Sequence, residues 1–206
     1  VGGILQAIHG NIRVGGHETF ITEACEYTNS FLNFRPRYSL ILNIEEDHLD
    51  FFKDIDDIRH SFHLFAANTA PEGCIILNGA IDRYQEITQG LPAKTITYGL
   101  DASDDFHAQN ISYDENGCAS FDAMQGSSLY GRITLSIPGE HNILNALAAI
   151  ALAVQMNLPK DAVFQGLGAF AGTKRRFEKK GTLGGITIVD DYAHHPTEIR
   201  ATLQAA

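Results

Sequence analysis

The sequence predicts an α/β fold, in which helices flank a mostly parallel sheet that carries a small antiparallel β insertion. Short apolar runs alternate along the chain with runs of helical periodicity, which is typical of βαβ units. The run YSLILNI at residues 38–44 is almost continuously apolar, as in a strand buried on both faces of a parallel sheet. Near residue 102 the pattern changes to short β-type runs between turn signals, which predicts hairpins.

The first half of the chain is predicted to alternate strands with helices. The run ETFITEA is rich in Thr, Phe and Ile and indicates a strand that ends at Glu23, and apolar residues spaced three and four apart follow Asp54 as in a helix. The expected elements are strands over 18–24, 38–44, 74–77 and 94–98 and helices over 54–68 and 80–89. This order predicts right-handed crossovers with helices on both faces of the sheet.

The second half is predicted to begin with the antiparallel insertion, at about residues 102–137, on the edge of the main sheet. Asn116-Gly117 and Gly126 separate its β-type runs. The expected elements are strands over 106–113, 119–123 and 129–137, helices over 140–156 and 160–170, a strand over 186–189 and a helix from Pro196 to the last residue. The helix over 140–156 is apolar nearly all round and should therefore be buried.

Composition limits the classes of protein and partner. With 206 residues and 44% hydrophobic content, the chain can bury an ordinary core. A net charge of −10 disfavours nucleic acid as a partner. No apolar run approaches the roughly 18 residues of a membrane span, and the start lacks a signal peptide, so we expect no membrane insertion and a cytoplasmic location. Both ends interrupt predicted structure, which indicates a piece of a larger protein.

The stretch from Gly172 to Ile199 carries the strongest chemical signal. Its five cations are Lys174, Arg175, Arg176, Lys179 and Lys180. The predicted strand over 186–189 follows, and it leads directly to Asp190, Asp191, His194 and His195. Open α/β sheets bind ligands at the carboxyl ends of their strands, so this order suits a phosphate site. The alternative is that the basic run is only a solvated surface loop.

Two further groups of residues could contact a nucleotide. Glu23 and His48 each follow a predicted parallel strand, and a Glu oxygen with a His nitrogen can hold Mg²⁺ or Mn²⁺ if phosphate oxygens and water complete the octahedron. The alternative is that His48 caps the following helix. Asn142 and Asn145 in the apolar helix could bind an adenine edge, or could be core amides satisfied by backbone. The phosphate-loop pattern GxxxxGK[ST] occurs nowhere.

Five motifs closely resemble those of the Mur ligases of peptidoglycan synthesis. They are TEACEYTNSFL at 22–32, LNIEEDHLDFF at 42–52, PGEHNILNALAAIALA at 138–153, GTKRRFE at 172–178 and DDYAHHPTEI at 190–199. The resemblance runs from end to end of the chain. Family members have an N-terminal UDP-binding domain, a central ATP-binding domain opened by a phosphate loop, and a C-terminal Rossmann-like domain. The resemblance implies an incomplete central domain over residues 1–181 and a truncated C-terminal domain over 182–206.

The resemblance also implies roles for individual residues, with ATP and Mg²⁺ (or Mn²⁺) as cofactors. It places Glu23 and His48 at the metal, and Arg176 against the ATP phosphates. Tyr192 and His194 fall where the site meets the incoming amino acid. The positions that match the nucleotide-binding residues are His141, Asn142, Asn145, Arg176 and Asp191. The positions that match catalytic residues are Arg176, His194, Glu23 and His48.

The closest likeness is to the branch of the family that joins L-alanine to UDP-N-acetylmuramate. Several sister ligases have a carbamylated lysine where this chain has Phe62 and His63, which favours the alanine-adding branch. The missing N- and C-terminal domains would be needed for ligation, so the isolated chain is expected to be inactive. The alternatives are a murein-peptide recycling ligase, another Mur ligase, or a nucleotide-binding module without catalysis.

Overall fold

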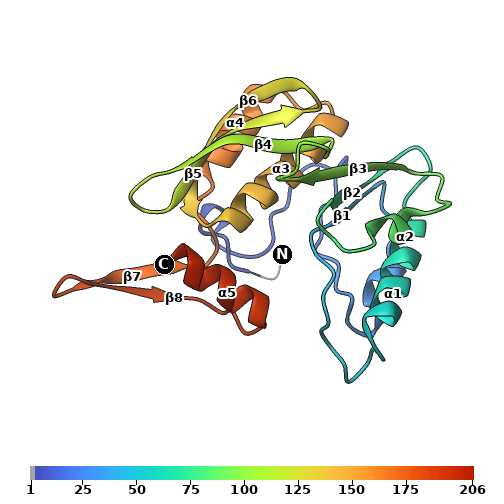
Figure 1. Cartoon of the computed structure of the whole chain (residues 1–206), viewed down its shortest axis with the longest axis horizontal. Helices are drawn as coiled ribbons and strands as arrows, with labels where there is room; N and C mark the ends of the chain where they lie inside the picture. Colours follow the sequence, from blue (N-terminus) through green and yellow to red (C-terminus); the bar gives the residue numbers. More distant parts are fainter. Residues whose placement is uncertain (1–2) are drawn as a thin grey trace.

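The computed structural model describes residues 3–206 and contains a six-stranded sheet and a separate two-stranded sheet (Figure 1). The strands of the large sheet lie in chain order, and they are β1 Tyr38–Ile41, β2 Cys74–Asn78, β3 Lys94–Gly99, β4 Phe106–Tyr113, β5 Cys118–Gln125 and β6 Ser128–Pro138. The small sheet consists of β7 Glu178–Leu183 and β8 Ile186–Asp190. The α-helices are α1 Ile55–Ala67, α2 Tyr84–Thr88, α3 Glu140–Gln155, α4 Lys160–Ala169 and α5 Pro196–Ala205. The 3₁₀ segments are η1 Gln6–Ile8 and η2 Tyr27–Asn33.

The large sheet changes from parallel to antiparallel at β4. Strands β1 to β4 pair in parallel, whereas β4, β5 and β6 form antiparallel hairpins. The predicted α/β fold with a β insertion is therefore confirmed. The hairpins continue the main sheet, because β4 pairs with β3 through Tyr98 opposite Phe106 and Gly99 opposite His107.

Helices cover both faces of the parallel strands, as predicted. Side chains alternate along β2, so that Ile75 and Leu77 pack with α1 and α2 while Cys74 and Ile76 pack with α3. This arrangement makes β2 a central strand whose side chains are almost all buried. Helix α3 fills the second core with Ile143, Leu147 and Ile150 among others, and its polar first turn reaches the surface.

Most predicted helix ends agree with the structure to within a residue or two. Helix α1 is capped by Asp54, whose side chain accepts a hydrogen bond from the Asp57 amide at 3.0 Å. Helix α2 is shorter than predicted, because Arg83 adopts the left-handed conformation and the helix starts only at Tyr84. None of the helices within residues 3–206 is long and apolar enough to span a membrane.

Three predicted strands differ from the structure. The run 38–44, expected to be buried on both faces, forms only the half-buried edge strand β1, and Leu42 is 47% exposed. Residues 18–24, all of which the structure describes, form no strand, and Phe20 and Ile21 are 85% and 76% exposed. Such a run becomes a strand only where a neighbour supplies hydrogen bonds, and β1 is the last strand on this side of the described sheet. The strand over 186–189 exists as β8, but it pairs with β7 in a hairpin rather than with the parallel sheet.

The β7–β8 hairpin has a local cause. Gly184 and Gly185 lie between the two strands with φ of 58° and 82°, values that match the two-residue turns favoured in hairpins. Figure 1 shows the hairpin projecting away from the large sheet, with α5 beside its base. The prediction that β8 is a parallel strand of an open sheet is therefore wrong for the described chain.

We expect the antiparallel half to contribute strongly to stability. Phe121 on β5 is fully buried, so Phe121→Ala should lower the free energy of unfolding by about 3–5 kcal/mol. Leu129 on β6 is 59% exposed, and Leu129→Ala should change it by less than about 1 kcal/mol. Urea unfolding monitored by circular dichroism measures both; equal losses would contradict the packing described here.

Candidate functional site

The first turn of α3 begins the candidate site. Gly139 precedes this helix with φ of 100°, and a Cβ there would lie 2.6 Å from Cε1 of His141. Glycine is therefore required both by the backbone conformation and by the position of the His141 ring. Asn142 Nδ2 lies 3.1 Å from Nε2 of that ring and donates a hydrogen bond to the Pro138 carbonyl at 2.7 Å.

The amides of α3 differ in how far they are already satisfied. Asn142 is part-buried and bonds to backbone, which supports the structural alternative for this residue, while its Oδ1 accepts from Asn145 Nδ2 at 3.3 Å. Asn145 is exposed and keeps its carbonyl oxygen available toward solvent. Both amides therefore lie on one polar edge of α3, and Asn145 is the more exposed of the two.

His141 is electrostatically coupled to residues more than thirty positions away. Desolvation by the surrounding protein lowers the pKa of His141, the Asp191 carboxylate opposes this shift, and the Arg176 guanidinium adds to it. The imidazole is therefore neutral near pH 7. His141 therefore lies within electrostatic range of Arg176 and Asp191, all three of them predicted nucleotide-binding residues.

Asp191 organises the backbone around this place. Its Oδ2 accepts hydrogen bonds from the Phe177 amide at 2.8 Å and the Thr202 hydroxyl at 3.2 Å, and its Oδ1 accepts from the Ala193 amide at 2.7 Å. One carboxylate thus joins the turn after Arg176, the segment after β8, and α5. Phe177 itself has φ of 48°, so this contact also stabilises an unfavourable backbone conformation.

The two adjacent arginines contact different partners. The Arg175 guanidinium lies over the Tyr192 ring at 4.5 Å, and the Arg175 carbonyl accepts from the Tyr192 amide at 2.8 Å. Arg176 Nη1 donates to Glu198 Oε1 at 3.1 Å and its side chain is 52% exposed. Arg176 therefore presents much of its guanidinium to solvent, while Arg175 orients Tyr192.

Glu198 completes the start of α5. Burial favours its neutral form, but the His194 amide and the Arg176 guanidinium outweigh that effect and lower its pKa. His195 and Glu198 form a capping box, and His194 Nδ1 lies 3.0 Å from the Tyr192 carbonyl with its side chain 69% exposed. Tyr192 and His194 lie next to each other, with ring centroids 5.2 Å apart.

The predicted metal pair is placed differently from expectation. His48 Nε2 lies 3.5 Å from Glu26 Oε1, its ring packs on Tyr27 with centroids 4.5 Å apart, and Tyr27 donates to Asp50 at 2.8 Å. Glu23 lies in the irregular segment before η2, because the strand expected to carry it to the sheet edge does not form. Asp54 caps α1, so the proposal that His48 caps this helix is wrong.

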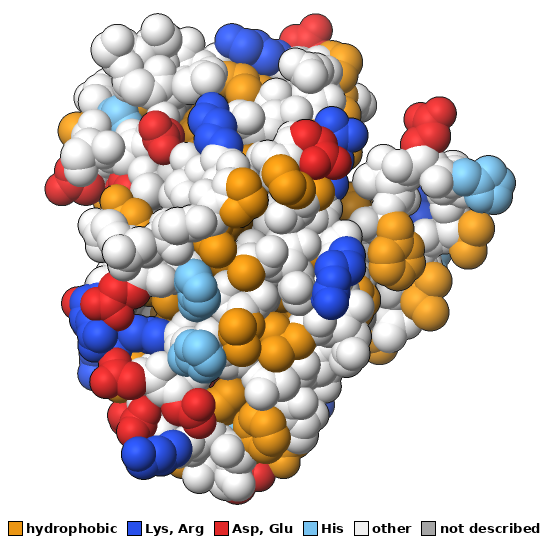
Figure 2. All heavy atoms as spheres, turned by 90° about the vertical axis from the view of Figure 1, so that its right-hand side faces the viewer, with side chains coloured by type: hydrophobic (Ala, Val, Ile, Leu, Met, Phe, Trp, Pro, Cys, Tyr) orange, Lys and Arg blue, Asp and Glu red, His pale blue; other side chains and the backbone are white. Residues whose placement is uncertain are grey.

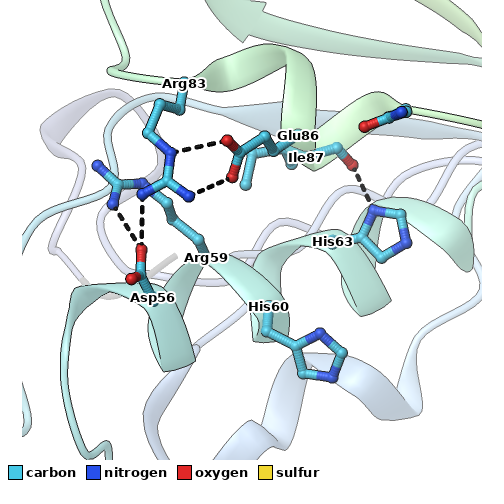
Figure 3. A pocket seen from close by; sticks show the side chains of 8 residues that line it. Asp56, Arg59, His60, His63, Arg83, Glu86 and Ile87 are labelled. Carbon is cyan, nitrogen blue, oxygen red and sulfur yellow. Dashed lines mark hydrogen bonds and ion pairs between the residues drawn. The ribbon is translucent and has the colours of Figure 1, made fainter.

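Arg59 lines two hollows in the part of the chain that the structure describes. One of about 530 Å³ separates the loop after β1 from the start of α5 and is lined by Ile44, Glu45, Glu46, Ile55, Arg59, His195 and Pro196. The other, of about 290 Å³, lies between α1 and α2 (Figure 3). Figure 2 shows the face of the molecule that carries α1 and α2, on which acidic and basic side chains are interspersed.

The hollow between α1 and α2 contains no predicted site residue, and its charges largely neutralise one another. Asp56 accepts from Arg59 at 3.1 Å and from Arg83 at 2.8 Å, and Arg83 also forms a two-pronged pair with Glu86 (Figure 3). The Arg83 and Arg59 guanidinium groups lower the pKa of Asp56. We therefore do not assign the main site to this hollow.

Sequence reasoning missed three residues of the site. Glu26 and Tyr27 contact His48, and nothing in their spacing indicated it. Glu198 pairs with Arg176, and its position three residues after His195 is the spacing of a capping box, so this signal was available. Among residues 3–206, no group of three or more His, Cys, Asp or Glu side chains is arranged to hold a metal ion.

The chain belongs to the Mur ligase family. Residues 4–153 match the model of the Mur ligase middle domain, and residues 175–206 match that of the Mur ligase glutamate ligase domain. The large sheet and α3 therefore belong to the part that matches the middle domain. The segment 175–199 belongs to the part that matches the second domain model.

The relatives found are mainly ligases that act on UDP-N-acetylmuramate. All of this chain aligns with the UDP-N-acetylmuramate--L-alanine ligase of Agathobacter rectalis, with 64% identity. The aligned part is 45% of that protein. The structure of MurC, the UDP-N-acetylmuramate-alanine ligase of Thermotoga maritima, is similar over all of this chain and 46% of that one, with a TM-score of 0.83 and 28% identity. The chain thus spans less than half the length of these relatives.

A structure from a different ligase is also similar. It is the UDP-N-acetylmuramate:L-alanyl-gamma-D-glutamyl-meso-diaminopimelate ligase from Neisseria meningitides. The match covers 71% of this chain and 44% of the Neisseria chain, with a TM-score of 0.62 and 29% identity. Its TM-score and its coverage of this chain are lower than those of the Thermotoga structure.

The coupling of His141 to its neighbours predicts a titration result. In the wild-type chain, His141 should titrate below the ordinary value of about 6.5. Because Arg176 contributes to lowering this pKa, Arg176→Met should raise it, and Asp191→Asn should lower it further. NMR titration of the His141 ring protons measures each shift. Lys179→Met is the control, and a His141 pKa that responds equally to Lys179→Met and Arg176→Met would contradict the geometry.

Proposed function

We propose that this chain is the central part of an ATP-dependent ligase that joins L-alanine to UDP-N-acetylmuramate in cytoplasmic peptidoglycan synthesis. The observation that carries the proposal is the convergence of His141, Arg176 and Asp191, in a chain 64% identical throughout to an enzyme named for this reaction. The proposed division is a central domain over 1–181 and the start of a C-terminal domain over 182–206, with a boundary that falls within the β7–β8 hairpin.

The proposed nucleotide site lies between α3 and the 175–199 segment. The adenine edge contacts His141, Asn142 and Asn145, where a neutral imidazole can accept a hydrogen bond that an imidazolium cannot. The phosphates contact Arg176, whose half-exposed guanidinium exchanges Glu198 for phosphate oxygens. Asp191 contributes mainly by holding the turn that carries Arg176, through the Phe177 amide.

The proposed cation, Mg²⁺ or Mn²⁺, would take Glu23 and His48 as its protein ligands. A magnesium ion commonly uses one or two protein groups and completes its octahedron with phosphate oxygens and water. Two protein ligands would leave coordination positions for phosphate oxygens and water, as for a cation that binds together with ATP. When bound, it would supply positive charge beside the transferred phosphoryl group.

The reaction proposed for the complete enzyme has two steps. The lactyl carboxylate oxygen of UDP-N-acetylmuramate attacks the γ-phosphorus of ATP, and ADP leaves. The L-alanine amine then attacks the acyl carbon, the nitrogen loses a proton to solvent, and inorganic phosphate leaves as the amide forms. Arg176 stabilises the charge spread over the phosphoryl oxygens without any proton transfer. His194 and Tyr192 lie at the exposed edge of the site, where the amine would approach.

Two alternatives remain distinguishable from this proposal. A recycling ligase would join a whole peptide to the same nucleotide sugar, as the name of the Neisseria relative indicates for that protein. A nucleotide-binding module without catalysis would bind ATP and form no product. Incubation of the full-length protein with ATP, UDP-N-acetylmuramate and either L-alanine or the tripeptide separates these functions. Faster product formation with the tripeptide would overturn the proposal.

The isolated 206-residue chain should form no UDP-N-acetylmuramoyl-L-alanine. The reactants must be held together for catalysis, and the chain covers only 45% of its relatives. Chromatographic detection of the product, with the full-length enzyme as the positive control, measures this. Product formation by the isolated chain would show that the remaining domains are dispensable.

Arg176 should matter far more than its neighbouring cations in the full-length enzyme. Arg176→Lys should lower kcat by about 10²-fold or more, because an ammonium group cannot reproduce the planar fork of a guanidinium. Lys179→Ala is the matched control and should have little effect. Steady-state ATP turnover with both co-substrates measures the difference, and equal losses in both variants would indicate a diffuse electrostatic patch.

Glu23 and His48 should control the cation requirement. Glu23→Ala and His48→Ala should each raise the Mg²⁺ concentration needed for half-maximal turnover, because each removes a ligand. A Mn²⁺ titration followed by electron paramagnetic resonance in the presence of ATP should show weaker binding in both variants. Unchanged Mg²⁺ and Mn²⁺ dependence would return both residues to a structural role.

A further inference from the structure

We propose that Glu45 and Thr197 are positioning residues, which hold the first turn of α5 against the loop after β1. The inference rests on the proposed function, because its catalytic consequence concerns Tyr192 and His194 at the start of α5. The contact itself is independent of that function. It joins two segments about 150 residues apart, as the separation of 152 positions between Glu45 and Thr197 shows.

Two hydrogen bonds form this link, one from Thr197 and one from His195 Nε2, and His195 Nδ1 lies near the Glu45 carboxylate. The Thr197 hydroxyl donates to Glu45 Oε2 at 2.5 Å, His195 Nδ1 lies 3.3 Å from the same oxygen, and His195 Nε2 lies 3.2 Å from the Glu46 carbonyl. The side chains of His195 and Glu45 are 24% and 31% exposed, so solvent only partly screens them. A charged acceptor in such surroundings makes the hydroxyl contact strong.

The hydrogen bonds of His195 define how the link works. Nδ1 accepts from the Thr197 amide at 3.4 Å in the capping box, so in the neutral ring Nε2 carries the proton and donates to the Glu46 carbonyl. The Glu45 carboxylate therefore takes its hydrogen bond from Thr197. It also lies at the N-terminus of a ten-residue helix, where a negative charge is favourable.

The position of the link gives it a functional consequence. Glu45 precedes the candidate metal ligand His48 by three residues, and Thr197 follows the candidate substrate residue His194 by three. The link therefore fixes the distance between the loop of His48 and the exposed edge of the amino-acid site. It also closes one side of the hollow of about 530 Å³ lined by Glu45, Glu46, His195 and Pro196.

A second anchor makes the proposal testable without unfolding the protein. Thr202, further along α5, donates to Asp191 at 3.2 Å, so α5 stays attached when the Glu45 contact is removed. Loss of Glu45 should therefore loosen the first turn of α5 and leave the remainder in place. Glu46 provides a matched control, because the contact to His195 uses its backbone carbonyl rather than its side chain.

The first experiment is hydrogen exchange on the 206-residue chain. In Glu45→Ala and Thr197→Val, amides of the first turn of α5, including Ile199, should exchange roughly tenfold faster, because each variant removes one charge-assisted hydrogen bond. Amides of β2 should be unchanged. Thr197→Ser keeps the hydroxyl and should behave as wild type, as should Glu46→Ala. Equal exchange in Glu45→Ala and Glu46→Ala would overturn the proposal.

The second experiment measures the consequence in the full-length enzyme. Glu45→Ala and Thr197→Val should lower kcat roughly three- to tenfold with little change in KM for ATP, because misplacement of the amino-acid edge affects the reaction more than nucleotide binding. Thr197→Ser should restore kcat. Unchanged kcat in both variants would overturn the positioning role. A wild-type enzyme that forms no product would refute the proposed function alone, since the exchange result does not depend on it.

Discussion

The Asp191 carboxylate is the interaction on which the arrangement of the site depends. It accepts hydrogen bonds from two backbone amides and one hydroxyl, and these donors belong to the turn after Arg176, the segment after β8, and α5. An ionised carboxylate forms stronger hydrogen bonds than a neutral carbonyl, so a single side chain can hold three segments that have little apolar packing of their own. Helix α5 has no buried residue, so polar contacts such as that of Thr202 with Asp191 help to attach it.

Charge is used locally in a chain that is acidic overall. The net charge is −10, yet Arg175 and Arg176 are adjacent in the chain. Each arginine has a separate partner, Tyr192 for Arg175 and Glu198 for Arg176, so the like charges are separated and oriented. The Arg176 field reaches His141 and favours its neutral form. A phosphate group in place of the Glu198 carboxylate would meet the Arg176 guanidinium in the same orientation.

The sequence predicts elements well where their causes are local. The spacing of apolar residues predicted α1, and the turn signals predicted strands β4 to β6 closely. Prediction failed where the cause lies elsewhere in the chain. Residues 18–24 have a strand-like composition without a described neighbour to pair with, and β8 joined β7 because of Gly184-Gly185. The Glu26–His48 and Glu45–Thr197 contacts depend on the tertiary fold, so no local pattern indicates them.

The change from parallel to antiparallel pairing at β4 has a consequence for the order of folding. Strands β4, β5 and β6 are joined by short turns and α3 follows directly, whereas β1 and β2 pair only after the α1 segment is enclosed. Closing a short loop loses less chain entropy than closing a long one, so the antiparallel half should assemble first and serve as a template for β3. Pulse-labelling hydrogen exchange would then show protection of Phe121 before Ile75. Because only two residue pairs join β3 to β4, this narrow junction would limit the rate at which the parallel half is added.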